Sequence, residues 1–413
     1  MSAAFSIALS ALSADTTAIN AVGNNLANLN TTGYKSVDVN FEDLMSLSLG
    51  TGANSAQVGM GVGPAGTFAS YTQGTVTTTN EPMDAAIQGQ GFFVVRNSGG
   101  QTLYTRDGSF KLDGSGNVVT QTGEFVQGWA AVNGTVNASG AVSNLTAPLG
   151  TTVPAIVTTT MGITANLNSA TATNGTFSAP IQVYDSLGTS HTLTVNFTET
   201  SANNWNYTVT VPAADLASGG DPKIASGTLT FDGKGNLSSP AASDDPVALK
   251  ITGLADGAAD MNINWNLYNG TNSTITQYAE ASSVGATPQN GAAAGQIQDV
   301  SLENGGLLVA NYSNGQQVTI GQLALASIPN PDSMVSVGNN NLQSSAFTGD
   351  IALGAAGSGG RGQIVANSLE SSTVDMATQF TDMLTYERGY QAASRVITTS
   401  DQMVQDTENL IHP

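Results

Sequence analysis

Apolar residues recur every seven positions near both ends of the chain. Seven residues is close to two helical turns, so each set lies along one seam of a helix. A seam this narrow cannot form a core alone, so each helix needs a partner, either the other terminus or a second copy. We therefore expect the ends to mediate assembly. The N-terminal set is Phe5, Leu12, Ile19 and Leu26, and the C-terminal set is Leu369, Met376, Met383, Tyr390, Ile397, Val404 and Ile411.

Helix breakers define the limits of both helices. From Ser2 to Asn30 there is one glycine and no proline, and the following Thr31-Thr32-Gly33 provides a stop. From Ser368 to Ile411 there is again one glycine and no proline, which predicts a helix of up to roughly 65 Å. The first helix also has a weaker second stripe, in which a buried polar position could set the register. This stripe consists of Ala8, Asp15, Val22 and Leu29.

Short apolar runs and period-two alternation fill the middle of the chain. Runs at 92–95, 103–104 and 118–119 are bounded by Gly and Asn turns, whereas 193–197 and 261–267 alternate between apolar and polar residues. Such alternation is typical of antiparallel strands with one buried face. The predicted fold class is therefore mainly β with terminal α-helices, in a nested multidomain chain.

The order of these segments suggests three domains, because periodicity lapses around 143–174 and 280–295. The N- and C-terminal helices are expected to form a coiled-coil-like inner domain, and the strands two β-rich outer domains. The predicted limits are 1–34 and 366–413 for the terminal helical assembly domain, 35–145 and 281–365 for a discontinuous β-rich domain, and 146–280 for an inserted β domain.

Composition excludes several classes of function. Thirty acidic residues against ten basic ones give a net charge of −20, which argues against nucleic acid and anionic membrane surfaces. The absence of cysteine excludes disulfides and thiolate chemistry. There is no run of eighteen apolar residues and no basic residue before Lys35, so we expect neither membrane insertion nor a cleaved signal peptide.

The sequence offers little support for catalysis or for a metal site. The two histidines are His412 at the tail and His191, which we expect to be a surface residue of a strand. Residues 113–117 and 232–236 present several oxygens, as calcium loops do, but glycines at their second and fourth places favour hairpin turns. We predict no catalytic residue, no cofactor and no bound metal.

The densest local signal is the Asn-rich stretch from Asn24 to Lys35, with four Asn residues near the predicted helix end. Asn is unfavourable inside a helix because its amide competes for backbone hydrogen bonds. The stretch is either a frayed helix end or a set of amides that bond to neighbouring subunits. The motif residues that we single out are Asn24, Asn25, Asn28, Gly33 and Tyr34.

Several stretches together resemble the flagellar rod and hook family of axial proteins. They lie at both ends of the chain and in the first β segment, so the resemblance covers the chain. The N-terminal pair is Gly23-Asn24-Asn25-Leu26-Ala27-Asn28 and Thr32-Gly33-Tyr34-Lys35, followed by 84–93 (DAAIQGQGFF), 104–110 (YTRDGSF), 369–375 (LESSTVD) and 386–391 (YERGYQ).

Within that family, the inserted β domain resembles the one that distinguishes hook members from the shorter rod members. The resemblance implies a structural, non-enzymatic subunit of the bacterial flagellum that polymerises into a curved, flexible tube, a universal joint between motor and filament. It implies extracellular assembly after type III export, with the hook cap, distal rod and hook–filament junction proteins as partners. The alternatives are a distal rod protein or a secreted β-rich adhesin.

Overall fold

The structure is a computed structural model that describes residues 3–44, 47–49, 56–64, 66–148 and 150–411. The chain is mainly β with a long helix at each end, which confirms the predicted fold class. It divides into two compact units. Unit 1 consists of Met1–Leu149, Val300–Ala310 and Val318–Pro413, and unit 2 of Gly150–Asp299 and Asn311–Gln317. The three-domain division stays a prediction.

Unit 1 contains both helices and most of the short strands. Its elements are α1 (Ala3–Ala27), β1 (Val37–Asn40), β2 (Leu47–Leu49), β3 (Ala56–Val58), β4 (Gly66–Ala69), β5 (Val76–Thr78), β6 (Ala85–Gln88), β7 (Phe92–Arg96), β8 (Thr102–Thr105), β9 (Phe110–Leu112), β10 (Val118–Thr120), β11 (Phe125–Val132), β12 (Thr135–Val136), β13 (Ser143–Asn144), β31 (Leu325–Ser327), η3 (Pro331–Ser333), β32 (Val335–Gly338), β33 (Asn341–Gln343), β34 (Ala352–Gly354), β35 (Gln363–Ala366), β36 (Ser368–Glu370) and α2 (Met376–Ile411).

The chain passes from one unit to the other at four points, and three of these lie within strands. These strands are β28 (Gly295–Glu303), β29 (Leu307–Tyr312) and β30 (Gln317–Leu323). In unit 1 an antiparallel sheet follows the order β30-β11-β7-β8-β33-β32. Its core contains Phe92, Tyr104 and Trp129, and strands β35 and β36 return from the C-terminal side to pair with β6 and β5.

Unit 2 holds the strictly alternating strands. Its sheet β17-β18-β19-β20-β21 is antiparallel, and its second sheet has the order β15-β23-β22. Every second residue of β18 and of β23 is buried, so the period-two prediction is confirmed. Trp205 and Trp265 lie in the shared core, where the Trp265 ring meets Tyr207 edge to face with centroids 5.2 Å apart.

The elements of unit 2 are β14 (Thr152–Val153), β15 (Thr160–Gly162), β16 (Thr164–Asn166), β17 (Thr176–Tyr184), β18 (Ser190–Ser201), β19 (Asn204–Thr210), η1 (Ala213–Asp215), β20 (Lys223–Phe231), β21 (Leu237–Ser239), η2 (Ala242–Asp244), β22 (Val247–Ile251), β23 (Met261–Asn266), β24 (Tyr268–Asn269), β25 (Asn272–Ser273), β26 (Ile275–Thr276) and β27 (Ser283–Ala286).

The two Asp-Gly-x-Gly-Asn stretches form the same hairpin turn in different units. The Asp113 carboxylate accepts hydrogen bonds from the backbone N–H groups of residues 115 and 117, and Asp232 does so from those of 234 and 236. One turn joins β9 to β10, and the other joins β20 to β21. Since each carboxylate is engaged by its own turn, the hairpin interpretation is confirmed.

Candidate functional site: the paired terminal helices and a buried charge hub

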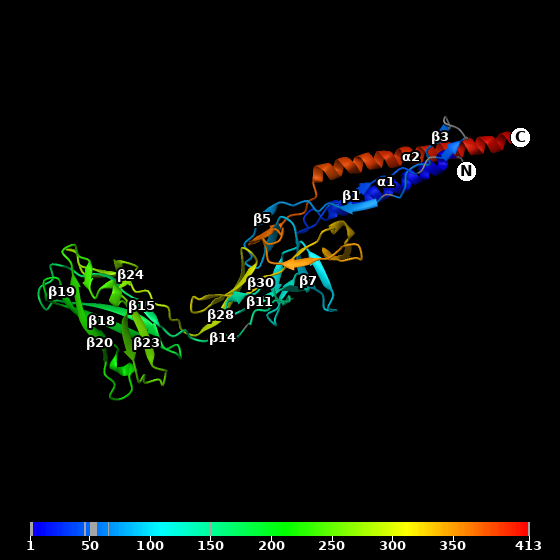
Figure 1. Ribbon diagram of the computed structural model, residues 1–413. Coiled ribbons are helices and arrows are strands. Elements are labelled where there is room, and N and C mark those ends of the chain that lie inside the picture. Colours follow the sequence, from blue (N-terminus) through cyan, green and yellow to red (C-terminus); the bar gives the residue numbers. More distant parts are fainter. Residues whose placement is uncertain (1–2, 45–46, 50–55, 65, 149, 412–413) are drawn as a thin grey trace. The chain divides into compact units, whose positions relative to one another are not determined.

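Helices α1 and α2 lie side by side in opposite directions, blue and red in Figure 1. Asn25, near the end of α1, hydrogen-bonds Gln379, near the start of α2, whereas Asp15 faces Gly389 farther along. A Cβ atom at Gly389 would lie 2.9 Å from the Asp15 carboxylate, so glycine permits this close approach. Within the chain, each terminal helix therefore has the other as its partner.

Small or polar side chains occupy the buried positions of this pair. The weaker stripe of α1 packs more deeply than the stronger one, since Ala8 and Val22 are buried and Asp15 is half-buried. The predicted seam residues Phe5, Leu12, Ile19 and Leu26 are only half-buried, so apolar surface remains beside the contact with α2. The buried positions are Ala8, Ala14, Ala18, Val22 and Asn25 in α1, and Gln379, Ala393 and Ser400 in α2.

The C-terminal helix begins later than the sequence pattern predicts. Residues 368–370 pair with β5 as strand β36, so the prediction that Leu369 belongs to the helical seam is wrong. The Asp375 carboxylate accepts a hydrogen bond from the Thr378 N–H, a capping interaction that starts the helix. This bond and others to the carboxylate lower the pKa of Asp375. Local strand pairing and the cap together override the heptad spacing.

The remaining C-terminal seam residues differ in exposure. Met383 and Ile397 are half-buried, Met376, Tyr390 and Val404 are exposed, and the Ile411 side chain lies outside the described residues. Their role in assembly stays a prediction.

Helix α2 also has an apolar flank, which we define as Met376, Phe380 and Leu384. These side chains are 49%, 52% and 56% exposed. Spacing of four residues makes them neighbours on the helix surface. The part of the chain that the structure describes leaves about half of each of these side chains exposed.

Asn25 is the fully buried member of the Asn-rich motif and links three elements. Its Nδ2 donates to the Val37 carbonyl and to Gln379 Oε1, both at 2.9 Å, and its Oδ1 accepts the Val37 N–H at 2.9 Å. Tyr34 Oη also donates to Asn25 Oδ1. The amide thus satisfies β1 as a neighbouring strand would, while holding α2 against α1.

The other motif residues surround Asn25. Asn24 donates to Tyr34 Oη, and Asn28 donates to the Asn24 carbonyl. Gly33 has a φ of +67°, and a Cβ there would lie within 3 Å of the Arg106 and Asp107 backbone. The prediction that motif amides contact neighbouring subunits is not tested by these bonds within the chain.

A buried charge cluster lies beside this motif, and we call Lys35, Gln73, Arg106 and Glu370 the Glu370 hub. Glu370 Oε1 accepts hydrogen bonds from Lys35 Nζ at 2.6 Å, from Gln73 Nε2 at 2.9 Å and from the Gly74 N–H at 2.8 Å. Its Oε2 lies 3.3 Å from an Arg106 guanidinium nitrogen. The Glu370 side chain is fully buried, so the carboxylate has exchanged water for protein donors.

The hub combines one carboxylate with two cations. Burial lowers the pKa values of Lys35 and Arg106, while Glu370 opposes this shift by charge and hydrogen bonding. Arg106 also donates to the Gly89 carbonyl, and its guanidinium lies 5.1 Å from the centre of the Phe92 ring. Removing the carboxylate would leave two buried positive charges, so Glu370 is the residue on which the hub depends.

The hub joins sequence motifs that are far apart in the chain. Lys35 closes the N-terminal motif, Arg106 lies in the 104–110 stretch, and Glu370 lies in the 369–375 stretch. These stretches indicated the family, but the sequence pattern did not predict that the three charged residues meet. The available signal was composition: of only ten basic residues in 413, three lie inside the quoted motifs, and Lys35 and Arg106 are two of these three.

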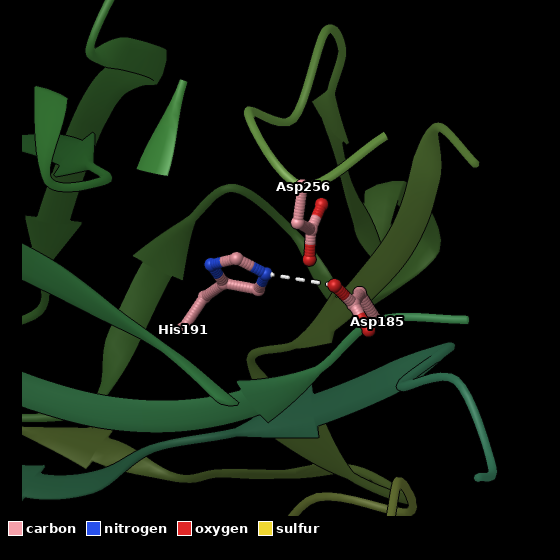
Figure 2. Close-up of side chains that lie close together, drawn as sticks. All are labelled: Asp185, His191 and Asp256. Carbon is pink, nitrogen blue, oxygen red and sulfur yellow. Dashed lines mark hydrogen bonds and ion pairs between the residues drawn. The ribbon is translucent and has the colours of Figure 1, made fainter. Parts of the chain in front are cut away.

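Unit 2 contains a second charged cluster, in which Asp185 and His191 are buried and Asp256 is exposed; we call it the His191 cluster and define it as Asp185, His191, Asp215 and Asp256 (Figure 2 shows all but Asp215). His191 Nε2 lies 3.1 Å from Asp185 Oδ2, and Nδ1 lies 3.0 Å from Asp215 Oδ2. His191 is on strand β18 as expected but is 3% exposed, so its prediction as a surface residue is wrong. His191, Leu193 and Val195 are alternate residues of the strand and therefore point to the same face, which was the signal for burial.

Electrostatic interactions within the cluster favour a charged imidazole. Burial opposes protonation of His191, but hydrogen bonds and charges from Asp215 and Asp185 outweigh it and raise the His191 pKa. For Asp185, burial raises the pKa, but hydrogen bonds with the Asp256 side chain, with His191 and with two backbone N–H groups outweigh it and lower the pKa to about 2. Without another cation, the cluster is therefore held as an ion pair.

Helix α1 is long and apolar enough to span a membrane, since an 18-residue stretch within Ala4–Ala27 has a mean hydropathy of 1.2. The absence of a long uninterrupted apolar run predicted no such segment. Core helices meet the same criterion, and one buried face of α1 packs on α2. The finding carries little weight for membrane insertion.

Comparisons with known proteins agree over the chain. Four sequence models match: Flagella basal body rod protein at 5–35, Flagellar hook protein FlgE/F/G D1 domain at 86–169, Flagellar basal body protein FlaE D2 domain at 144–292, and Flagellar basal body rod FlgEFG protein C-terminal at 365–410. Lys35, Arg106 and Glu370 each lie within a matched segment.

Relatives with the same name align over nearly their full length. The flagellar hook protein of Treponema pallidum is 34% identical over 95% of this chain and 96% of its own. That of Salmonella typhimurium is 33% identical over 98% and 99%. A crystal structure of a Helicobacter pylori flagellar hook protein, at 14% identity, covers 71% of this chain and 100% of its own with a TM-score of 0.51, which supports the fold. The chain belongs to the flagellar hook protein family.

Proposed function

We propose that the chain is a structural subunit of the bacterial flagellar hook and polymerises into a curved, flexible tube that transmits torque as a universal joint. The main support is similarity to hook proteins along almost the whole chain. Neither the distal rod nor the adhesin alternative has comparable support. The role is mechanical rather than catalytic.

The paired terminal helices supply the contacts that hold subunits together in this proposal. Helix α2 is 36 residues long, or about 54 Å, and residues 401–409 are all exposed. Its apolar flank is also uncovered. Full burial of an exposed apolar side chain contributes about 1.5–3 kcal/mol, and covering the exposed half of each flank residue contributes roughly half of that, so several contacts per subunit could offset the entropy of association. The occupant that we propose is a second copy of the chain.

The remaining partners follow from the place of a hook in the flagellum. The subunit is exported by the flagellar type III apparatus without a cleaved signal and assembles outside the cell. Its neighbours are the hook cap during growth, the distal rod below and the junction proteins above. A net charge of −20 makes subunits repel, so added salt should favour assembly.

A substitution in the apolar flank tests this proposal. Phe380→Asp should block polymer formation, because a charge would replace a ring that neighbouring subunits bury. Phe380→Leu keeps an apolar side chain and should still polymerise. Sedimentation and electron microscopy of the purified chain in salt measure assembly, and circular dichroism checks that the β units stay folded.

Two outcomes would contradict the proposal. If Phe380→Asp polymerises as well as the unaltered chain, the flank is not a subunit contact. If the unaltered polymer is straight and rigid in micrographs, a rod role fits better than a hook role.

A further inference from the structure

The His191 cluster brings three metal-ligand groups to one point in unit 2. A ring nitrogen of His191 and one carboxylate oxygen each from Asp185 and Asp256 lie within 4.8 Å of one another. In Figure 2, Asp256 points towards the space beside Asp185 and the imidazole. Asp185 follows β17, His191 lies on β18, and Asp256 lies in the loop between β22 and β23. The site therefore joins segments 60–70 residues apart in sequence.

Each of the three groups is held by its other polar atom. Asp185 Oδ1 accepts the N–H groups of Leu187 and Thr189, at 2.8 and 2.9 Å. Asp256 Oδ1 accepts the Ala258 N–H at 3.1 Å. The second oxygen of Asp185 faces the other two groups, 3.1 Å from His191 Nε2 and engaged with the Asp256 side chain, so a shared cation would replace these contacts. Preorganised ligand atoms of this kind are what a metal site requires.

His191 is held in the same way, by a carboxylate outside the three groups. Its Nδ1 lies 3.0 Å from Asp215 Oδ2, and Nε2 is the nitrogen that faces Asp185. Histidines that bind metals usually donate the second ring N–H to a carboxylate, which fixes the tautomer and orients the ring. Asp215 is in turn fixed, because its carbonyl accepts the Ala255 N–H.

The charges of the cluster favour a dication. Three carboxylates surround one imidazole, so a protonated His191 neutralises one of three negative charges. Its Nε2–H can reach Asp185, but no hydrogen bond joins it to Asp256 among the described residues. A divalent ion would contact both carboxylates and the neutral imidazole together.

We propose that His191, Asp185 and Asp256 bind a divalent cation of the zinc class, with Asp215 orienting the imidazole. Zinc accepts imidazole nitrogen and carboxylate oxygen at about 2.0–2.2 Å, which places ligand atoms roughly 3.4 Å apart. His191 and Asp185 are already 3.1 Å apart. Asp256 completes the set by a small movement of its exposed loop, which has glycines at 253 and 257. Water fills the fourth position.

The role of such an ion is structural. It ties the turn after β17, the η1 segment and the loop before β23 into one end of unit 2. The rival explanation is that a protonated His191 alone holds the cluster as an ion pair, in which case added zinc has no specific site.

Isothermal titration of the full chain with zinc chloride decides between these explanations. An excess of magnesium chloride in both solutions suppresses general binding to the acidic surface. We expect one saturable site per chain, and the same site in His412→Gln, which alters the other histidine. His191→Gln should abolish it.

Two further variants test the same site if His191→Gln does not fold. Asp256 is exposed, so Asp256→Asn should leave the fold intact while weakening zinc binding at least about tenfold. Asp215→Asn removes the orienting carboxylate and should weaken binding about 10–100-fold. At a fixed zinc concentration the thermal midpoint should rise most in the unaltered chain and in His412→Gln, less in Asp256→Asn and Asp215→Asn, and not in His191→Gln. Absence of a saturable site, or a site unchanged by Asp256→Asn and His191→Gln, would overturn the proposal.

Discussion

The Glu370 hub and the His191 cluster each centre on a buried ionisable side chain, but their charges are opposite in balance. The hub has two cations around one carboxylate, and backbone groups complete the coordination of that carboxylate. The cluster has three carboxylates around one imidazole. The carboxylate of the hub is thus fully paired within the protein. The cluster, in contrast, has more carboxylates than one imidazolium can neutralise and could bind a further cation. Charge balance, more than burial, separates a structural ion pair from a candidate binding site.

The two also differ in what they join. The hub connects segments that are 71 and 264 residues apart, near the junction of the terminal helices with the β strands of unit 1. The cluster connects neighbouring loops within unit 2. Loss of the hub should therefore loosen the helical ends, while loss of the cluster should affect unit 2 alone.

The largest effect is expected from Glu370→Gln. The substitution keeps size but leaves Lys35 and Arg106 as buried charges without a counterion, which should cost about 3–5 kcal/mol. Hydrogen exchange read by mass spectrometry should show lost protection in peptides covering 85–106 and 363–379, with unit 2 unchanged. Lys250→Met breaks an exposed pair 3.8 Å from Asp260 and is the matched control, with an expected cost of at most about 1 kcal/mol. Equal effects of the two variants would show that the buried hub stabilises the protein no more than an exposed ion pair does.

A smaller effect is expected from Asn25→Ala, which tests whether a neutral buried group supports the same region. It leaves the Val37 N–H and carbonyl without their side-chain partner and removes a bond to Gln379, so we expect a loss of about 1–3 kcal/mol. Faster hydrogen exchange in 5–29 and 376–390 should report the loss. Asn24→Ala, at an exposed neighbour, should change little. If Asn25→Ala is also silent, the amide does not hold the helices together.

Sequence patterns predicted the elements better than they predicted the contacts. Alternation located β18 and β23, and Asp-Gly chemistry located the two matching turns, because both signals are local. The heptad spacing identified two helices but not which stripe packs more deeply, since small Ala8 and Val22 permit closer approach than the bulkier Leu12. It also placed Leu369 in a helix, where pairing with β5 prevailed.

Contacts between distant segments were beyond the reach of local patterns. Lys35, Arg106 and Glu370 meet only because β5, β6 and β36 are brought together, and no periodicity encodes that meeting. Asp256 joins His191 through a loop whose position depends on the closure of unit 2. Only the burial of His191 was accessible, through its strand parity with Leu193.

The smallest effect, and the one that best separates the two clusters, is the pH dependence of unit 2 with metal removed by a chelator. The raised pKa of His191 means that its stabilising contribution is complete below the unfolded value of about 6.5 and is lost as pH rises through the folded pKa. The lowered pKa of Asp185 means that its contribution is present above about 3.9 and is lost as pH falls towards about 2. Unit 2 should therefore be most stable between these limits and weaken above them by at most about 1.4 kcal/mol per pH unit.

Urea unfolding measures this dependence, with Trp129→Phe confining the fluorescence signal to Trp205 and Trp265 of unit 2. His191→Gln should flatten the decline at higher pH. With zinc present, the stability of unit 2 should rise rather than fall with increasing pH. The metal competes with the proton for Nε2 and binds better as the imidazole becomes neutral. If zinc does not alter this loss of stability at higher pH, His191 forms only an ion pair within the protein, as Glu370 does. The two clusters would then differ only in their location.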